Sequence, residues 1–260
     1  MSVARPHGEF TQAYRKDTKG LQVVGTTRSP SKAPSGELQL VEMNVTSTAS
    51  VAAGVESAME ILGGVDVLIN NAGISHISPF EDTPEEWGRK IMETNFFGVV
   101  RVTREVLPVM RKQSGGLIIN VGSLAGVLGI PYQSYYVASK FALEGFTESL
   151  RLELGGLGIR LVVIEPGHFH TEINQNRSVL DSVTPCYQKG YTALKEKVES
   201  TMDQAESPEG VARLVYELIR KKKPAIRYPI GKGAGAISFA VRQLPSRIVE
   251  RVLRGYFRQP

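Results

Sequence analysis

The sequence predicts an α/β protein in which a doubly wound parallel sheet forms a single domain. Short apolar runs alternate with longer amphipathic stretches, as in parallel strands that are joined by helices. Hydrophobic residues make up 42% and charged residues 22% of the 260-residue chain, which is ordinary globular usage. A chain of this length can bury a sizeable core. We see no internal repeat and no linker, so residues 1–260 are taken as one domain.

The apolar runs define the expected strands in chain order. They lie at residues 21–27, 38–45, 65–69, 117–121, 160–164 and 225–230. Residues 65–69 and 117–121 are almost entirely apolar, as in strands that are buried on both faces. Capping residues and apolar residues at three- and four-residue spacing predict the helices. The expected helices span residues 9–19, 47–62, 83–112, 134–154, 207–222 and 245–257.

Polar or special residues follow or close several of the predicted strands. They are Arg28, Asn44, Asn71, Ser123 and Pro166. In a doubly wound sheet, ligands bind outside the carboxyl ends of the strands. These positions therefore predict one ligand site along that edge of the sheet.

Tyr136 and Lys140 are four residues apart in the expected helix at 134–154, so they lie on one face of it. A free tyrosine has a pKa of about 10. A neighbouring cation lowers that pKa and makes the phenol a tunable proton donor. The alternative is a surface pair on one helical face, which this spacing alone does not exclude.

Five motifs in order make the chain resemble a short-chain dehydrogenase/reductase from about residue 20 onward. They are Asn70-Asn71-Ala72-Gly73, Asn95-Phe96-Phe97-Gly98, Ser123 thirteen residues before Tyr136, Tyr136-x-x-x-Lys140 and Pro166-Gly167-x-x-x-Thr171. The tail, with Arg227-Tyr228-Pro229 and a terminal helix, resembles the steroid- and retinol-dehydrogenase-like branch. The resemblance implies a Rossmann-type fold and an oxidoreductase that acts on CH–OH groups with a nicotinamide cofactor.

The resemblance also implies roles for four catalytic residues. Tyr136 is expected to be the acid in carbonyl reduction or the base in alcohol oxidation. Lys140 is expected to lower the pKa of Tyr136 and to bind the nicotinamide ribose. Ser123 would hydrogen-bond the substrate oxygen where charge develops. Asn95 would hold a water that relays protons to Lys140, or it is simply a polar residue that kinks its helix.

The expected cofactor residues follow from the same resemblance. The stretch 71–73 would pass close to the adenosine ribose, unless it is only a strand-to-helix turn. Pro166-Gly167 and the backbone after them would pack on the nicotinamide, and Thr171 would bond its amide or the pyrophosphate. The full set is Arg28, Asn44, Val45, Asn71, Ala72, Gly73, Tyr136, Lys140, Pro166, Gly167, Phe169 and Thr171.

Arg28 favours NADP over NAD, because a cation at this place suits the 2′-phosphate. A site that prefers NAD usually has an acidic residue there, and none occurs between residues 23 and 35. The alternative for Arg28 is a solvated loop cation. Asn44-Val45 stands where the family usually has Asp-Val beside the adenine, and asparagine can still donate or accept a hydrogen bond.

The N-terminus departs from the family pattern. The first strand and its Thr-Gly-x-x-x-Gly-x-Gly turn are missing or degenerate: Gly8 matches the last glycine, while Pro6 and Ser2 replace the other two. That turn normally brings the pyrophosphate to a helix N-terminus. Three interpretations stay open: a truncated or mis-started enzyme, a rebuilt segment, or an inactive relative that binds or regulates. The intact catalytic residues favour the first.

The resemblance implies a substrate lid at 168–206, and its apolar residues, with those of the stretch 128–132, predict a largely apolar pocket. The resemblance to the steroid- and retinol-dehydrogenase-like branch implies a small hydrophobic ketone, aldehyde or alcohol as substrate. The lid residues are Ile173, Val179, Leu180, Val183, Tyr187, Tyr191 and Leu194. The terminal segment 245–260 has an arginine face opposite an apolar face. It fits either a peripheral membrane contact or a helix that packs on the core with a solvated basic face.

Composition excludes several other classes of protein. The net charge is +5, but no nucleic-acid-binding module or basic face with interleaved aromatics accompanies it. The single cysteine, Cys186, excludes an internal disulfide and has no ligand partner at metal-site spacing. No signal peptide and no apolar run of membrane-spanning length occur, which favours the cytoplasm or a membrane surface facing it. The family often pairs through the helices around Asn95 and Tyr136, so we expect a homo-oligomer.

Overall fold

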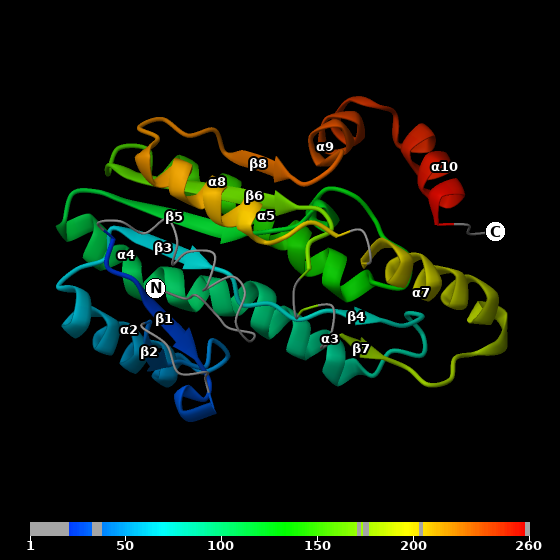
Figure 1. The fold of residues 1–260 in the computed structure, drawn as a ribbon, viewed down its shortest axis with the longest axis horizontal. Coiled ribbons are helices and arrows are strands. Elements are labelled where there is room, and N and C mark those ends of the chain that lie inside the picture. The colour runs from blue at the N-terminus through cyan, green and yellow to red at the C-terminus, as the bar shows by residue number, and fades with distance from the viewer. Residues whose placement is uncertain (1–20, 33–37, 171–172, 174–176, 203–204, 258–260) are drawn as a thin grey trace.

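The structure, a computed structural model, describes residues 21–32, 38–170, 173, 177–202 and 205–257. Four parallel strands form its main sheet in the order β3 (Val67–Asn70), β5 (Gly116–Val121), β6 (Ile159–Pro166) and β8 (Arg227–Ile230) (Figure 1). A second parallel pair consists of β1 (Val24–Thr27) and β2 (Gln39–Glu42). The six longer strands are those that the sequence predicts, with ends that differ from the prediction by up to three residues.

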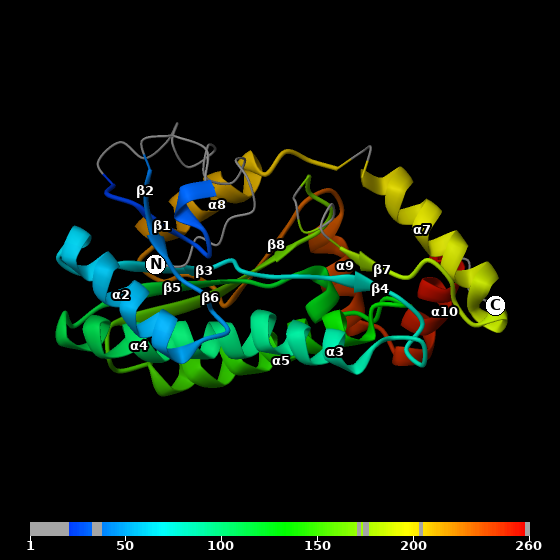
Figure 2. The same cartoon turned by 90° about the horizontal axis from the view of Figure 1, so that it is seen from below.

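Helices cover both faces of the main sheet (Figure 2). On one face lie α2 (Thr48–Leu62), α4 (Gly98–Lys112) and α5 (Ser134–Glu153), and on the other lies α8 (Glu209–Arg220). Leu68, Ile118 and Leu161 pack on the first face, and their strand neighbours Ile119 and Val162 pack on the second. This alternation follows from the two-residue period of a strand. The predicted doubly wound α/β fold is confirmed.

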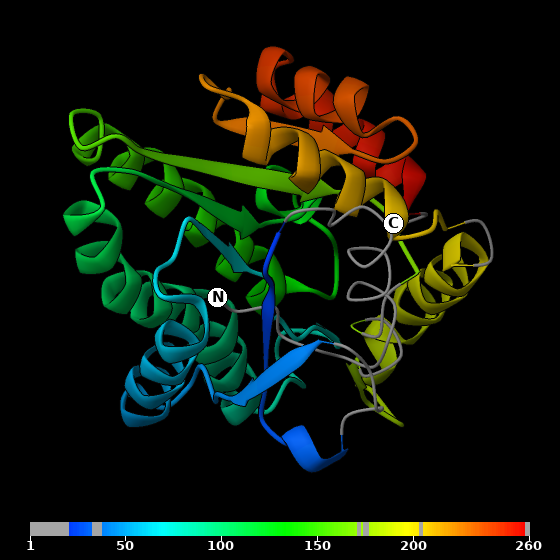
Figure 3. The same cartoon turned by 60° about the vertical axis from the view of Figure 1, so that its left-hand side comes forward.

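Among the described strands, β1 and β3 are not paired with each other. The first strand of the family pattern would lie between them. Helix α2 links the two sheets (Figure 3), because Val51 and Val55 pack in one cluster with Met43, just after β2, and with Leu68 of β3. The expected helix at 9–19 lies outside the described residues.

The helix expected at 83–112 is divided into three parts. They are α3 (Glu85–Met92), a π-helical turn, η2 (Glu93–Phe97), and α4. Wide turns of this kind are frequent at functional sites. Directly after this turn, the backbone at Gly98 lies close to the side chain of Val45. A Cβ at Gly98 would lie 2.9 Å from Cγ2 of Val45, so glycine is required there.

Three helices gather at the carboxyl end of the main sheet (Figure 1). They are α7 (Gln188–Met202), α9 (Ala234–Gln243) and α10 (Ser246–Tyr256). The sequence predicts α10, but α7 and α9 are additional. So are the short parallel strands β4 (His76–Ile77) and β7 (Ser178–Val179). None of the helices in the described part of the chain is long and apolar enough to cross a membrane.

Candidate active site

A cavity of about 1140 Å³ runs along the carboxyl ends of β1, β3, β5 and β6. Its wall brings together most of the sequence-predicted site residues. These are Arg28, Asn44, Val45, Asn71, Ala72, Gly73, Ser123, Tyr136, Lys140, Pro166, Gly167 and Phe169. Asn95 lies outside the wall, and Thr171 lies outside the described residues.

Tyr136 and Ser123 face each other across this cavity. Ser123 follows β5, Tyr136 lies in the first turn of α5, and the Ser123 side chain acts on the pKa of the Tyr136 phenol as a hydrogen-bonding group. Burial raises the pKa of Tyr136 above its ordinary value, while the bond to Ser123 and the charge of Arg177 act to lower it. The phenol is therefore held in its protonated form near neutral pH.

Lys140 lies one helical turn beyond Tyr136 and is only 4% exposed. Its Nζ donates a 2.8 Å hydrogen bond to the carbonyl oxygen of Val121 and lies 5.8 Å from the centroid of the Tyr136 ring. Burial lowers the pKa of Lys140 to about 8, and the carboxylate of Glu144 acts in the opposite direction.

The expectation that Lys140 lowers the pKa of Tyr136 stays a prediction. The charge of Arg177 acts to lower this pKa, and burial outweighs it. The ammonium of Lys140 points to the carbonyl group at the end of β5. The ring and the ammonium share a helix face, as their spacing predicts, but they are not in direct hydrogen-bond contact.

Asn95 is buried behind the cavity wall in η2. Its Oδ1 accepts a 2.9 Å hydrogen bond from the Ile74 amide, and its Nδ2 donates to the Ile74 carbonyl oxygen at 2.9 Å. Nδ2 also donates to Oγ of Ser139 at 3.0 Å. Asn95 thus fastens the 71–74 turn to α5, beside Lys140. Its role in a proton relay stays a prediction.

Arg28 and Asn44 lie at the β1–β2 end of the cavity. Arg28 follows β1 directly and is exposed. Oδ1 of Asn44 accepts hydrogen bonds from the Thr46 amide and hydroxyl, at 3.1 and 2.8 Å. This oxygen therefore orders the turn into α2.

At the other end, the chain leaves β6 through Pro166-Gly167. The Gly167 amide donates a 2.9 Å hydrogen bond to the Ile230 carbonyl oxygen, which continues the β6–β8 pairing past the strand. Phe169 lines the cavity and is also buried in the core on the α8 face, with Val211 and Val215. Phe169 therefore anchors the start of the predicted lid.

The expectation that lid residues supply the apolar wall is wrong for most of those that are described. Ile173 lines the cavity, but Tyr191 and Leu194 are buried with Ile77 in a separate cluster, and the Val179 side chain is exposed. The wall comes instead from α9 and α10. Its apolar residues there are Ile237, Ala240, Val241, Leu244, Val249, Val252 and Leu253.

None of the residues of helix α10 is buried, so this helix is not packed on the core. The interpretation of the terminal segment as a core-packed helix is therefore wrong. The apolar half of the helix faces the cavity instead. Sequence reasoning also missed Arg177, a cavity residue whose charge acts on Tyr136 and His168. Arg177 belongs to no motif, so its place follows only from the fold.

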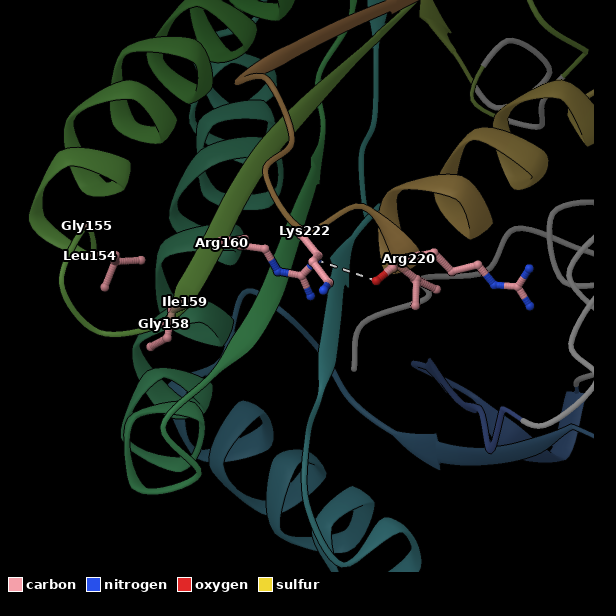
Figure 4. A pocket seen from close by; sticks show the side chains of 8 residues that line it. Leu154, Gly155, Gly158, Ile159, Arg160, Arg220 and Lys222 are labelled. Carbon is pink, nitrogen blue, oxygen red and sulfur yellow. Dashed lines mark hydrogen bonds between the residues drawn. The ribbon is translucent and has the colours of Figure 1, made fainter.

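A second hollow, of about 510 Å³, lies at the amino end of β6 (Figure 4). Arg160 occupies it and donates hydrogen bonds to the carbonyl oxygens of Lys221, at 2.6 Å, and Ile219, at 3.5 Å. These carbonyls end α8, where a cation is favourable. Arg160 therefore has a structural role as a cap.

Comparison with known proteins gives consistent matches. A family model described as short chain dehydrogenase matches residues 12–179. The 3-ketodihydrosphingosine reductase of Bacteroides thetaiotaomicron is 34% identical over 253 residues, covering 96% of this chain and 93% of that protein. Human 17-beta-hydroxysteroid dehydrogenase type 1 is 34% identical over 201 residues, 75% of this chain and 61% of the human protein. A solved short-chain dehydrogenase from Streptomyces avermitilis superposes with a TM-score of 0.79 at 27% identity, covering 98% and 97% of the two chains.

Proposed function

The chain belongs to the short-chain dehydrogenase/reductase family, and we propose that it interconverts a hydrophobic ketone or aldehyde and its alcohol with NADP(H). Tyr136 is the acid and base of this proposal. The observation that carries it is that Tyr136, Ser123 and Lys140 line one cavity, whose β1–β2 end is lined by Arg28 and Asn44.

The two hydroxyl groups suit a carbonyl substrate. An oxygen that enters between them accepts a hydrogen bond from both, and both bonds strengthen as negative charge develops on it. The raised pKa of Tyr136 keeps its proton in place for transfer to that oxygen. The nicotinamide, when bound, supplies or takes the hydride. In alcohol oxidation, Tyr136 takes the proton back.

The residues along the cavity fit a dinucleotide. Lys140 and Pro166-Gly167 would hold the nicotinamide ribose and ring beside Tyr136, and the stretch 71–73 would pass the adenosine ribose. Arg28, exposed at the far end of the wall, would bind the 2′-phosphate. The position of this cation at the β1–β2 end of the cavity is what supports NADP over NAD. Roles for Asn95 as a water holder and for Thr171 remain part of the proposal.

The apolar wall of α9 and α10 supports a hydrophobic substrate. Cavities of this kind take most of their affinity from apolar contacts and their orientation from a few polar groups. Two relatives are named for a ketodihydrosphingosine and a hydroxysteroid. A substrate with one carbonyl or hydroxyl group on a large apolar body is consistent with both the wall and the relatives.

Two surface features support the expected partners. On α10, the exposed Ile248 lies beside an arginine face, as in a cytoplasmic protein with peripheral contact to an anionic membrane, while Val252 and Tyr256 line the cavity. On α5, Leu152 and Phe141 are exposed, which suits homo-oligomer formation through this helix. Sedimentation with phosphatidylglycerol vesicles, against phosphatidylcholine vesicles, tests the first feature. Analytical ultracentrifugation of a Leu152→Glu variant tests the second.

The decisive variant is Tyr136→Phe, assayed by the oxidation of NADPH with a panel of hydrophobic ketones. Loss of the proton donor should lower kcat about a thousandfold, while cofactor affinity stays nearly unchanged. Tyr135→Phe is the matched control, because the Tyr135 ring packs on His76 and Phe80 outside the cavity wall. A Tyr136→Phe protein with full activity would remove Tyr136 from the acid/base role. A wild-type protein that binds NADPH but reduces no ketone would favour an inactive relative.

A further inference from the structure

Glu165 is a fully buried carboxylate at the end of β6, directly before the Pro166-Gly167 segment. A buried charge persists only where partners replace its lost hydration. Two of its partners lie one turn apart on α9. Oε2 accepts a 2.8 Å hydrogen bond from the Ser238 hydroxyl, and Oε1 forms a 2.8 Å ion pair with Arg242.

Arg227 of β8 connects these residues to helix α5, which carries Tyr136 and Lys140. Its Nε donates to Glu144 at 2.9 Å and lies 3.7 Å from Glu165, and its Nη2 donates to Glu148 at 3.0 Å. Glu144 lies one turn after Lys140 on α5. We call Glu144, Glu148, Glu165, Arg227 and Arg242 the charge cluster. It joins β6, β8, α5 and α9, and none of its members is part of the cavity wall.

Helix α9 has little apolar contact with the body of the protein. Only Ala234 and Ser238 are buried in it, whereas α8 buries Val211, Val215 and Leu218. Of the α9 residues that line the cavity, Ile237 is 41% exposed and Ala240 and Val241 are half-buried; Leu244, directly after the helix, is 44% exposed. Apolar burial therefore explains the position of α8 but not that of α9. The polar contacts of Ser238 and Arg242 are the main attachment.

We propose that Glu165 is a positioning residue that holds α9 in place through Ser238 and Arg242 and so sets the width of the apolar end of the cavity. Helix α10 follows α9 after two residues, so its cavity residues depend on the same attachment. The attachment of α9 thus selects substrates by the size of their apolar part. This consequence rests on the proposed function, but the attachment itself does not.

Hydrogen exchange of the α9 amides tests the attachment without any assay of activity. In Arg242→Met, amides 238–244 should exchange about tenfold faster, since a charge-assisted hydrogen bond to a buried group is lost. Arg242→Lys keeps the charge and should restore part of the protection. Arg213→Met is the control, because Arg213 forms an exposed ion pair with Glu209 on α8. Ser238→Ala provides a milder variant, with an effect in the same direction, if Arg242→Met does not fold.

Kinetics then tests the consequence with two probe ketones, acetone and 2-undecanone. In Arg242→Met, the KM for 2-undecanone should rise about tenfold, while its kcat and the KM for acetone stay nearly constant. Unchanged exchange in α9 would overturn the proposal, whatever the kinetics show. Equal rises in KM for both ketones would overturn the selection by size. If the wild-type protein reduces neither ketone, the proposed function fails, and the exchange result still decides whether Glu165 positions α9.

Discussion

The four interior residues of β5 are all buried, whereas β2 contains no buried residue. The main sheet has helices on both faces and a core cluster on each. The β1–β2 pair is linked to it chiefly through α2, by way of Met43 and Val45. The proposed proton-transfer residues therefore lie on a part of the fold that has its own core. The proposed adenosine end lies on the β1–β2 pair, whose core contacts come chiefly through α2.

A buried polar ladder adds to this contrast. Nδ2 of Asn70 donates to Oδ1 of Asn120 at 2.9 Å, and Nδ2 of Asn120 donates to Oγ1 of Thr147 at 2.8 Å. The two asparagines are register partners at the ends of β3 and β5, and Thr147 lies on α5. Fully paired polar networks in a core fix a unique arrangement. The ladder thus fixes the strand ends and α5, which carry Asn71, Ser123 and Tyr136.

The largest effect is expected from Asn120→Ala, which leaves buried partners unsatisfied and opens a cavity. It should lower the free energy of unfolding by about 2–4 kcal/mol, as measured by urea denaturation. Asn44→Ala is the matched change in the β1–β2 part. There the lost bonds are exposed, so about 0.5–1 kcal/mol is expected. Equal losses in the two variants would contradict the contrast between the two parts.

A smaller effect is expected from Arg28→Ala, which probes the β1–β2 part through cofactor affinity. If Arg28 binds the 2′-phosphate, the Kd for NADPH should rise about tenfold while the Kd for NADH stays the same. Arg104→Ala, on the exposed side of α4 and outside the cavity wall, is the control. A variant that loses both cofactors equally, or neither, would make Arg28 a solvated loop cation.

A third effect, on pH dependence, concerns Glu144 in the main part. Burial and the charge of Glu165 raise its pKa from an ordinary 4.5 to about 7, although Arg227 and Arg242 oppose this. The folded state therefore holds the proton where the unfolded state has lost it. Its contribution to stability is complete below about pH 4.5 and is lost as the pH rises through about 7.

Urea denaturation of the wild type and of Glu144→Gln across this pH range measures the contribution. The stability of the wild type relative to the variant should fall between pH 4.5 and 7 and then level off. A relative stability that increases with pH would mean that the ion pair with Arg227 outweighs burial, and the sign would be reversed.

Local patterns predicted the strands, most of the helices and the set of residues at the strand ends. Runs such as 117–121 read as buried strands because their two faces are both apolar, and Ser47 and Gly63 cap α2 as their types favour. The spacing of Tyr136 and Lys140 correctly placed both on one helix face. It did not give the direction of the lysine, because the carbonyl oxygen of Val121 that accepts its hydrogen bond lies on β5, outside the helix.

The apolar wall could not be predicted in the same way. Helix α9 begins with Ala234 and Gly235, has an exposed Phe239 and shows a weak apolar pattern, so no helix was expected there. Helix α9 follows β8 directly in the chain, and β8 ends beside the cavity. Glu165 likewise reads as the end of a strand before a proline. Its partners Ser238 and Arg242 lie more than seventy residues away in the chain.

The central claim is that this cavity holds a nicotinamide cofactor beside Tyr136 and Ser123, although β1 and β3 are unpaired with each other in the described chain. Titration of the protein with NADPH and NADH, followed by nicotinamide fluorescence, tests it most directly. Circular dichroism establishes that the sample is folded. The account predicts saturable binding of both cofactors, tighter for NADPH, in the wild type and in Tyr136→Phe alike. A folded protein that binds neither cofactor would contradict it.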